Sequence, residues 1–219
     1  MRICFHVSKL ACCAALLALV ALSPARAEEA GCEVLAVAGE AWLEGSTPRA
    51  LRMGERLAAG AELRTGAQGR VRLRCVDGST LLLADRSQLR LERLQARSAT
   101  AERDVSLLLR LGLVGQRIAP GGGRWEVRTP TAVTAVRGTE FMVEVGADQA
   151  TAVHVQSGEV AVEALSSQPR TRSLRPSPPP LLMGRAALGT RCDGSGECSE
   201  PKPWAEQRLK ELRQRLGEF

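Results

Sequence analysis

Cysteines are the residues of this chain whose chemistry is clearest from type and spacing. Three of the seven lie in an N-terminal leader. The other four follow it: Cys32, Cys75, Cys192 and Cys198. An even number of cysteines in an exported chain predicts disulfides. Cys192 with Cys198 would close a small loop, and Cys32 with Cys75 would then join the first strand to a central one. Free thiols and metal ligation stay open as alternatives, although metal ligation needs a second nearby pair or a histidine.

Few other residues have the types or spacing for catalysis. His154 lies in an alternating apolar stretch, where we expect a surface histidine on a strand. Asp77 and Asp85 could be considered as a catalytic carboxylate pair. However, Asp77 belongs to a turn, and nothing in the sequence places a general base near it. The glycines 121–123 precede a strand and therefore form a turn, not a phosphate-binding loop. No nucleophile elbow, zinc-protease motif or Walker loop is present. The sequence predicts no enzyme, no cofactor and no metal.

The charge of the chain excludes a nucleic-acid-binding protein of the usual kind. It has 30 Lys plus Arg and 24 Asp plus Glu, a formal net charge of +6. Three of the basic residues lie in the leader, which leaves 27 against 24, or +3. Arg70, Arg72 and Arg74 form one basic strand face, but no aromatic residues alternate with them. Such a face is ordinarily solvated, and contact with lipopolysaccharide or a protein is the alternative.

The first 27 residues have the pattern of a cleavable signal peptide. Two basic residues precede the apolar run 10–22, and Ala25 and Ala27 supply the small residues of a cleavage site before Glu28. The apolar run is too short to span a bilayer, and no later segment is apolar enough. We expect a periplasmic protein without a transmembrane span after cleavage; an uncleaved anchor is the alternative.

The region 28–165 alternates with the period of short strands. Val71, Leu73 and Cys75 share one face of their stretch, and Gly, Asp and Ser interrupt the pattern at intervals of 8 to 12 residues. Asp77 with the glycine after it predicts a hairpin turn. About ten such strands predict an all-β domain of the sandwich or solenoid type, with short strands that need stacked neighbours.

Two further segments follow the predicted β domain. Residues 166–190 are rich in Pro, Arg and Ser and predict an extended linker. Residues 191–219 hold the cysteine loop and an amphipathic helix. The apolar stripe of this helix must be covered, by its own domain, by another chain or by a membrane surface. We take it as a partner helix whose contact residues are Leu209, Leu212, Leu216 and Phe219.

A resemblance becomes specific in the segment 125–145, WEVRTPTAVTAVRGTEFMVEV. Together with the CVDGSTLLL turn and the closing valine hairpin, it resembles the FecR domain over roughly residues 33–164. The residues that carry the resemblance include Thr129, Pro130, Arg137, Gly138, Thr139 and Phe141. The resemblance implies a non-catalytic β domain of iron-transport regulators that also occurs as a stand-alone exported module. It does not by itself imply sigma-factor regulation, because a fold does not establish a function.

The motif has a physical interpretation that does not need the family. Pro130 lacks an N–H and biases the preceding residue to an extended conformation, which suits a strand end. Gly138 permits a bend between two apolar strands. Arg137 can donate several hydrogen bonds at that corner. A structural corner is the favoured interpretation, and an anion or ligand site formed by Arg137 and Thr139 is the alternative.

We therefore expect a non-catalytic periplasmic FecR-domain protein that acts as an interaction or signalling module with an envelope protein as partner. The alternative is a binding module for cell-wall glycan or an anionic envelope polymer. The basic strand face favours that alternative. A shortage of exposed aromatic residues opposes it, because we expect Trp42 and Trp125 in the core.

Overall fold

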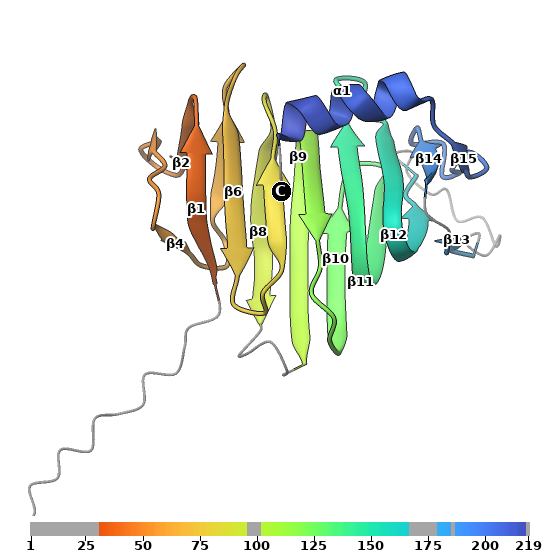
Figure 1. The fold of residues 1–219 in the computed structure, drawn as a ribbon, viewed down its shortest axis with the longest axis horizontal. Helices are drawn as coiled ribbons and strands as arrows, with labels where there is room; N and C mark the ends of the chain where they lie inside the picture. Colours follow the sequence, from red (N-terminus) through yellow and green to blue (C-terminus); the bar gives the residue numbers. More distant parts are fainter. Residues whose placement is uncertain (1–30, 96–101, 167–178, 185–186, 218–219) are drawn as a thin grey trace, which may run out of the picture.

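The computed structural model describes residues 31–95, 102–166, 179–184 and 187–217. The predicted signal peptide lies outside these residues and stays a prediction. Within them the chain forms an all-β domain and one C-terminal helix, as the sequence predicts (Figure 1). The elements are β1 Cys32–Ala38, β2 Ala41–Glu44, β3 Arg49–Ala50, β4 Arg56–Leu57, β5 Glu62–Thr65, β6 Arg70–Cys75, β7 Thr80–Leu83, β8 Gln88–Gln95, β9 Arg103–Arg117, β10 Gly123–Arg128, β11 Ala132–Val145, β12 Thr151–Ala164, β13 Leu181–Met183, β14 Leu188–Cys192, β15 Lys202–Pro203 and α1 Glu206–Leu216.

Strand pairing divides the sheet into two layers that are joined by three long strands, β9, β11 and β12. The first part of β9 pairs with β8 and β10, whereas its last residues pair with β7 and β11. We call layer A the part built from β3, β2, β5, β8, β10, β13 and the adjoining halves of the long strands. Layer B contains β4, β1, β6, β7, β14, β15 and the other halves.

The long strands pass between the layers at glycines. Gly112 in β9 has φ +91°, and a Cβ there would lie 2.5 Å from Ser87 Cα. Gly158 in β12 has φ +85°, and a Cβ there would lie 3.0 Å from Thr139 Cα of β11. The β11–β12 register shifts at the same level, just after Arg137. Only glycine satisfies both the backbone conformation and the close approach, so these corners make a two-layer sandwich from single strands.

The core lies between the two layers and consists of the inward side of the alternating pattern. On β6 the predicted alternation is confirmed, because Val71, Leu73 and Cys75 are buried. The largest fully buried side chains include Trp125, Phe141, Leu63, Leu81, Leu89, Leu107 and Leu109. The core joins strands far apart in sequence, so the β domain is one folding unit.

Part of the predicted linker belongs to the sheet. β13 and β14 both pair with β12, and the side chain of Met183 is fully buried in the core. The prediction of a linker over all of 166–190 is therefore wrong for Leu181–Met183 and for the start of β14. The apolar residues of these short strands complete the edges of the two layers, which proline content alone did not indicate. Residues 167–178 lie outside the described residues.

Helix α1 lies across the outer face of layer B (Figure 1). The predicted helix is confirmed at Glu206–Leu216. It begins without a side-chain cap at Ala205 and ends at Gly217, whose N–H donates to the carbonyl of Arg213. Within the described residues no helix has both the length and the apolar character that crossing a bilayer requires.

Candidate functional site

The first half of the sequence motif forms a buried cluster of threonine hydroxyls. Thr129 Oγ1 lies 2.6 Å from Thr151 Oγ1, which lies 2.7 Å from Thr131 Oγ1. Thr131 Oγ1 is also 3.0 Å from the carbonyl oxygen of Cys192. The hydroxyls thus tie the β10–β11 turn, which contains Pro130, to β12 and β14. Buried hydroxyls with satisfied hydrogen bonds fix geometry and leave no group free for a ligand.

The second half of the motif forms the corner of β11. The Thr139 hydroxyl lies 2.8 Å from the carbonyl oxygen of Arg137 and 3.0 Å from that of Glu159 on β12. Phe141 is fully buried in the core. Gly138 adopts φ +53° at the bend. Gly138, Thr139 and Phe141 therefore lie where the structural interpretation of the motif expects them.

Arg137 differs from the rest of the motif because its side chain is exposed on the outer face of layer A. The guanidinium of Arg137 makes no hydrogen bond or ion pair with any residue that the structure describes. It borders a shallow hollow of about 410 Å³. The hollow is lined by Gly123, Arg124, Trp125, Ala135, Val136, Arg137, Glu159 and Ala161. The expected hydrogen bonds from Arg137 to corner carbonyls are absent among these described residues, so its donors face solvent.

The apolar stripe of α1 is covered by its own domain. Leu209, Leu212 and Leu216 are buried at 5%, 1% and 3% exposure. They pack on the outward-facing side chains of Leu82, Ala84, Leu113 and Met142 in layer B. The prediction of a partner helix is thereby corrected, since β7, β9 and β11 present outward apolar residues that bury the stripe. Phe219 lies outside the described residues.

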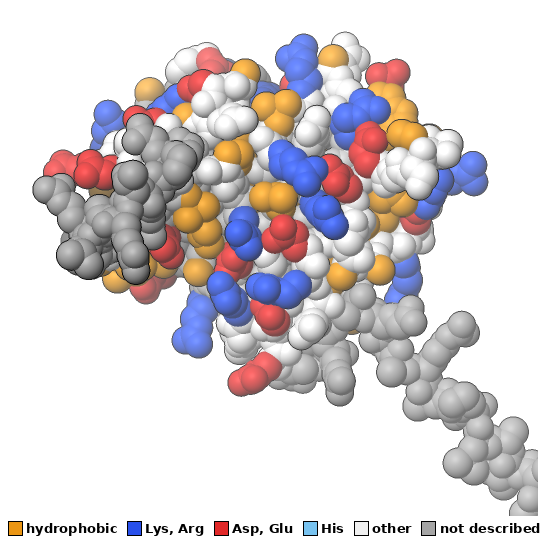
Figure 2. All heavy atoms as spheres, turned by 180° about the vertical axis from the view of Figure 1, so that it is seen from behind, with side chains coloured by type: hydrophobic (Ala, Val, Ile, Leu, Met, Phe, Trp, Pro, Cys, Tyr) orange, Lys and Arg blue, Asp and Glu red, His pale blue; other side chains and the backbone are white. Residues whose placement is uncertain are grey.

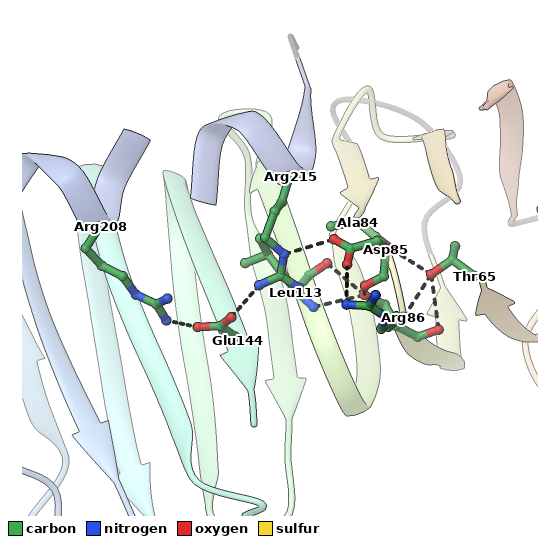
Figure 3. Close-up of polar contacts among 9 residues, drawn as sticks. Thr65, Ala84, Asp85, Arg86, Leu113, Glu144, Arg208 and Arg215 are labelled. Carbon is green, nitrogen blue, oxygen red and sulfur yellow. Dashed lines mark hydrogen bonds and ion pairs between the residues drawn. The ribbon is translucent and has the colours of Figure 1, made fainter. Parts of the chain in front are cut away.

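Ion pairs fasten α1 to the same face (Figure 3). Glu144 of β11 accepts hydrogen bonds from Arg208 and from Arg215, the latter at 2.6 Å. Arg215 also donates to Asp85, just after β7, at 2.9 Å. Burial alone would lower the pKa of Arg215, but its hydrogen bonds to Asp85 and Glu144 raise the pKa above its usual value. Asp85 is thus a helix anchor and not half of a catalytic carboxylate pair.

His154 is buried, contrary to the expectation of a surface strand histidine. It is 1% exposed, and its ring centroid lies 5.2 Å from that of Trp204. Neither ring nitrogen has a hydrogen-bond partner among the described residues. Burial, together with the positive charge of Arg213, lowers the pKa of His154 to about 4. The expectation is wrong because the segment after β14 folds back over the outer face of β12.

A buried ion pair that the sequence did not indicate connects the two layers at one end. Arg103, at the start of β9, donates to Asp77 Oδ2 at 3.0 Å and to the carbonyl of Ala119 at 2.8 Å. The Ser79 hydroxyl donates to the same carboxylate at 2.8 Å. The predicted hairpin turn at Asp77 is present between β6 and β7. Arg103 precedes an alternating stretch, and nothing in its sequence context signals burial.

The comparison with protein families identifies the β region. Residues 61–161 match the family model described as FecR protein. Residues 61–161, somewhat less than half of the chain, are thus assigned to the FecR domain. No curated protein matches the chain.

Solved structures resemble this FecR domain in fold. Two crystal structures of a candidate anti-sigma factor from Parabacteroides distasonis match with TM-scores of 0.51 and 0.52 at 20% and 18% identity. Each match covers 70% of this chain and 64% of the other, so the chain spans less than two thirds of that protein. At this identity the likeness concerns the fold, which here is the bent-strand β architecture described above.

Both predicted disulfides are present in the structure. Cys32–Cys75 joins β1 to β6 in the core of the β domain, and Cys192–Cys198 closes the small loop after β14. Trp125 is buried, as expected. Trp42 is not: it lies half-exposed on layer A with the Arg64 guanidinium 4.1 Å from its ring centroid. Its strand is near the edge of layer A, where none of the described elements covers the outer face.

The described residues contain no group of three or more His, Cys, Asp or Glu side chains placed to hold a metal ion. Several of their carboxylates form ion pairs across the strands of layer A, as in Arg64–Glu44 between β5 and β2 and Arg110–Glu62 between β9 and β5. Figure 2, seen from behind, shows basic and acidic side chains intermixed with apolar ones.

Proposed function

We propose that this protein is a non-catalytic, exported FecR-domain module that transmits or regulates a signal by contact with another protein of the cell envelope. The observation that carries the proposal is the placement of Arg137. It is the motif residue with a charged side chain, and it lies exposed and unpaired at the border of a surface hollow. Gly138 and Thr139 shape the corner that holds it there.

The surroundings of Arg137 suggest the chemistry of the partner. A guanidinium offers up to five N–H donors and binds carboxylates in a bidentate manner. The floor of the hollow is made by the small side chains Ala135 and Ala161. On the next strand Leu182, in register with Ala161, is 65% exposed. A partner segment with an acidic side chain beside an aliphatic one fits this combination of charge and apolar surface.

Three further features support export and regulation. The leader predicts passage across the inner membrane, and the two disulfides suit an oxidising compartment such as the periplasm. Solved relatives in fold are described as candidate anti-sigma factors, which agrees with a regulatory role. A signalling module also needs a rigid scaffold, and the disulfide-linked sandwich supplies one.

Site-specific photo-cross-linking in cells tests the proposal. A photoreactive residue at Ala135, in the hollow, should give a discrete adduct with one envelope protein. The same residue at Gln207, on the exposed side of α1, serves as the matched control and should give none. Adducts with glycan or lipid alone, or turnover of envelope substrates by the purified protein, would contradict the proposal.

A second candidate function, binding of a cell-wall glycan or anionic polymer, is favoured by Trp42. This half-exposed aromatic residue lies near a hollow of about 510 Å³ on layer A. The hollow is lined by Glu44, Gly45, Gly60, Glu62, Leu63, Arg64, Gln88 and Arg90. Arg64 already stacks on the Trp42 ring, which weakens this candidate. Retention of the protein on purified peptidoglycan at high salt, lost in Trp42→Ala, would favour it over protein contact.

A further inference from the structure

The surface beneath α1 is a second candidate contact site, on the opposite outer face from Arg137. Its floor is apolar and comprises Leu82, Ala84, Leu113 and Met142, all buried in the structure by α1. Outward-facing residues of a sheet are ordinarily polar when they meet water. These four side chains therefore require a cover.

Two carboxylates give the surface a specific charge. Glu144 and Asp85 have side-chain exposures of 16% and 17% while they accept hydrogen bonds from α1. Their partners Arg208 and Arg215 lie seven residues apart, two turns along the same side of α1. A half-buried carboxylate without a cation is costly, so whatever covers the floor must carry basic groups at this spacing.

The cover is attached to layer B by side chains and not by strand pairing. α1 has eleven residues, a length at which isolated helices are marginal in water, and Ala205 provides no side-chain cap. It shares no backbone hydrogen bonds with the strands of layer B, because its contacts are made by side chains. The sheet ladder beneath it stays complete when α1 leaves. An element of this kind can open locally without unfolding the sheet.

We propose that the surface under α1 is a helix-binding site, which α1 occupies until an amphipathic helix of a partner protein replaces it. The partner helix carries the pattern that α1 shows: apolar residues three and four positions apart, as in Leu209, Leu212 and Leu216, flanked by arginines that reach Glu144 and Asp85. This proposal rests on the proposed function only in that the occupant is a protein. The helix-binding site can be disproved while the contact at Arg137 is still supported.

A second copy of this chain is a less suitable occupant. Only Trp204 and Ala205 separate the end of β15 from the start of α1, a reach of about 7 Å. Trp204 is itself packed against His154, and β15 is paired with β14. The helix therefore has little freedom to extend into a neighbouring molecule while the strand before it stays in place.

Peptide binding to the full chain tests this site. The probe is a fluorescent peptide of residues 203–217, and the control probe carries Leu212→Asp. Two chain variants are compared, Leu212→Asp, which releases the internal helix, and Lys210→Asp, which alters its exposed side. Because an internal competitor lowers apparent affinity, the Leu212→Asp chain should bind the probe about tenfold tighter or more than the wild-type and Lys210→Asp chains. Equal binding by both variants would overturn the proposal.

The carboxylates supply the specificity control. Adding Glu144→Gln to the Leu212→Asp chain should weaken binding of the probe by roughly fivefold, since a charge-assisted bond becomes a neutral one. Affinity unchanged by Glu144→Gln would contradict a charge-matched site. The control probe should not bind either chain.

Two measurements on the wild-type protein keep the test valid if a variant does not fold. Amide hydrogen exchange should be much faster in α1 than in β9 and β11, by about a hundredfold or more; equal protection would show that α1 does not open separately and would overturn the proposal. Sedimentation should give a monomer. A dimer that Lys210→Asp retains and Leu212→Asp loses would assign the site to a second copy and contradict the partner helix.

Discussion

The two outer faces of the sandwich are built from the same long strands, but among the described residues one face is covered by a helix and the other is exposed to solvent. On layer B, β9 and β11 turn Leu113 and Met142 outward, and α1 covers them. On layer A the same strands turn polar or small side chains outward, including Arg110 and Ala135, and no described helix covers that face. A bend at glycine thus allows one strand to contribute residues both to the covered face and to the open face.

The contrast suggests where each kind of interaction belongs. Several charged residues of layer A are paired across strands, whereas Arg137 is unpaired among the described residues and borders a hollow. The acidic residues of layer B, Asp85 and Glu144, are used to hold α1. Contact through the open face needs no rearrangement, whereas contact through the covered face requires that α1 be displaced.

Loss of the ion pair between the layers should have the largest effect and should damage both faces together. Asp77→Ala leaves the buried Arg103 charge without its partner, so the free energy of unfolding should fall by about 3–5 kcal/mol. Denaturant unfolding measures it. The control is Asp148→Ala, whose ion pair with Arg191 is exposed, with an expected change within about 0.5 kcal/mol. Similar losses in both variants would mean that the layers do not depend on Asp77.

Closing a corner should have the next largest effect, again on both faces. Gly112→Ala puts a Cβ against Ser87 at a positive φ, and the loss of stability should be roughly 2–4 kcal/mol. Gly45→Ala is the matched control, because a Cβ there meets nothing within 4 Å. Thermal unfolding of the two variants compares them. A Gly112→Ala protein as stable as the control would refute the bent-strand arrangement.

Acid should weaken the covered face selectively through His154. Its folded-state pKa, about 4, lies below the ordinary value of 6.5, so the unfolded chain takes up the proton first. The contribution is intact above pH 6.5 and is lost as pH falls toward 4. His154→Leu should flatten this part of the stability profile, leaving the slope due to carboxylates. Equal slopes in the two proteins between pH 6.5 and 4.5 would show that protonation of His154 does not matter.

The smallest effect on stability is expected for Arg137→Ala. The side chain is exposed and unpaired among the described residues, so unfolding free energy should change by less than about 0.5 kcal/mol. Thermal unfolding beside the wild type checks this. A loss of several kcal/mol would mean that Arg137 supports the corner rather than a contact.

The strands and disulfides could be predicted because their signals are local. Alternation places Val71, Leu73 and Cys75 in the core, and the turn at Asp77 follows from the glycine after it. Once Cys32 and Cys75 lie on neighbouring strands, they are opposite each other in register. The motif could be interpreted as mainly a corner, since proline restricts the backbone and glycine permits a positive φ wherever they occur.

The errors concern contacts between distant segments. The side chain of His154 points away from the core between the two layers. It is buried because the segment that contains Trp204 packs over it. Arg103 is buried because it forms an ion pair with Asp77, which lies 26 positions earlier at the end of the other layer. The stripe of α1 predicted the need for a cover but not which surface provides it. Contacts of this kind, between segments far apart in the chain, produce no periodic pattern in the sequence.

Partner contact through the open face is tested most directly by the yield of the Ala135 photo-cross-link in cells that carry Arg137→Ala, compared with Arg128→Ala. Both arginines are exposed on layer A, but Arg128 does not line the hollow. We predict that Arg137→Ala abolishes the adduct with the envelope protein, at unchanged protein level, and that Arg128→Ala keeps it. An adduct of equal yield in both variants would contradict the assignment of the open face to partner contact.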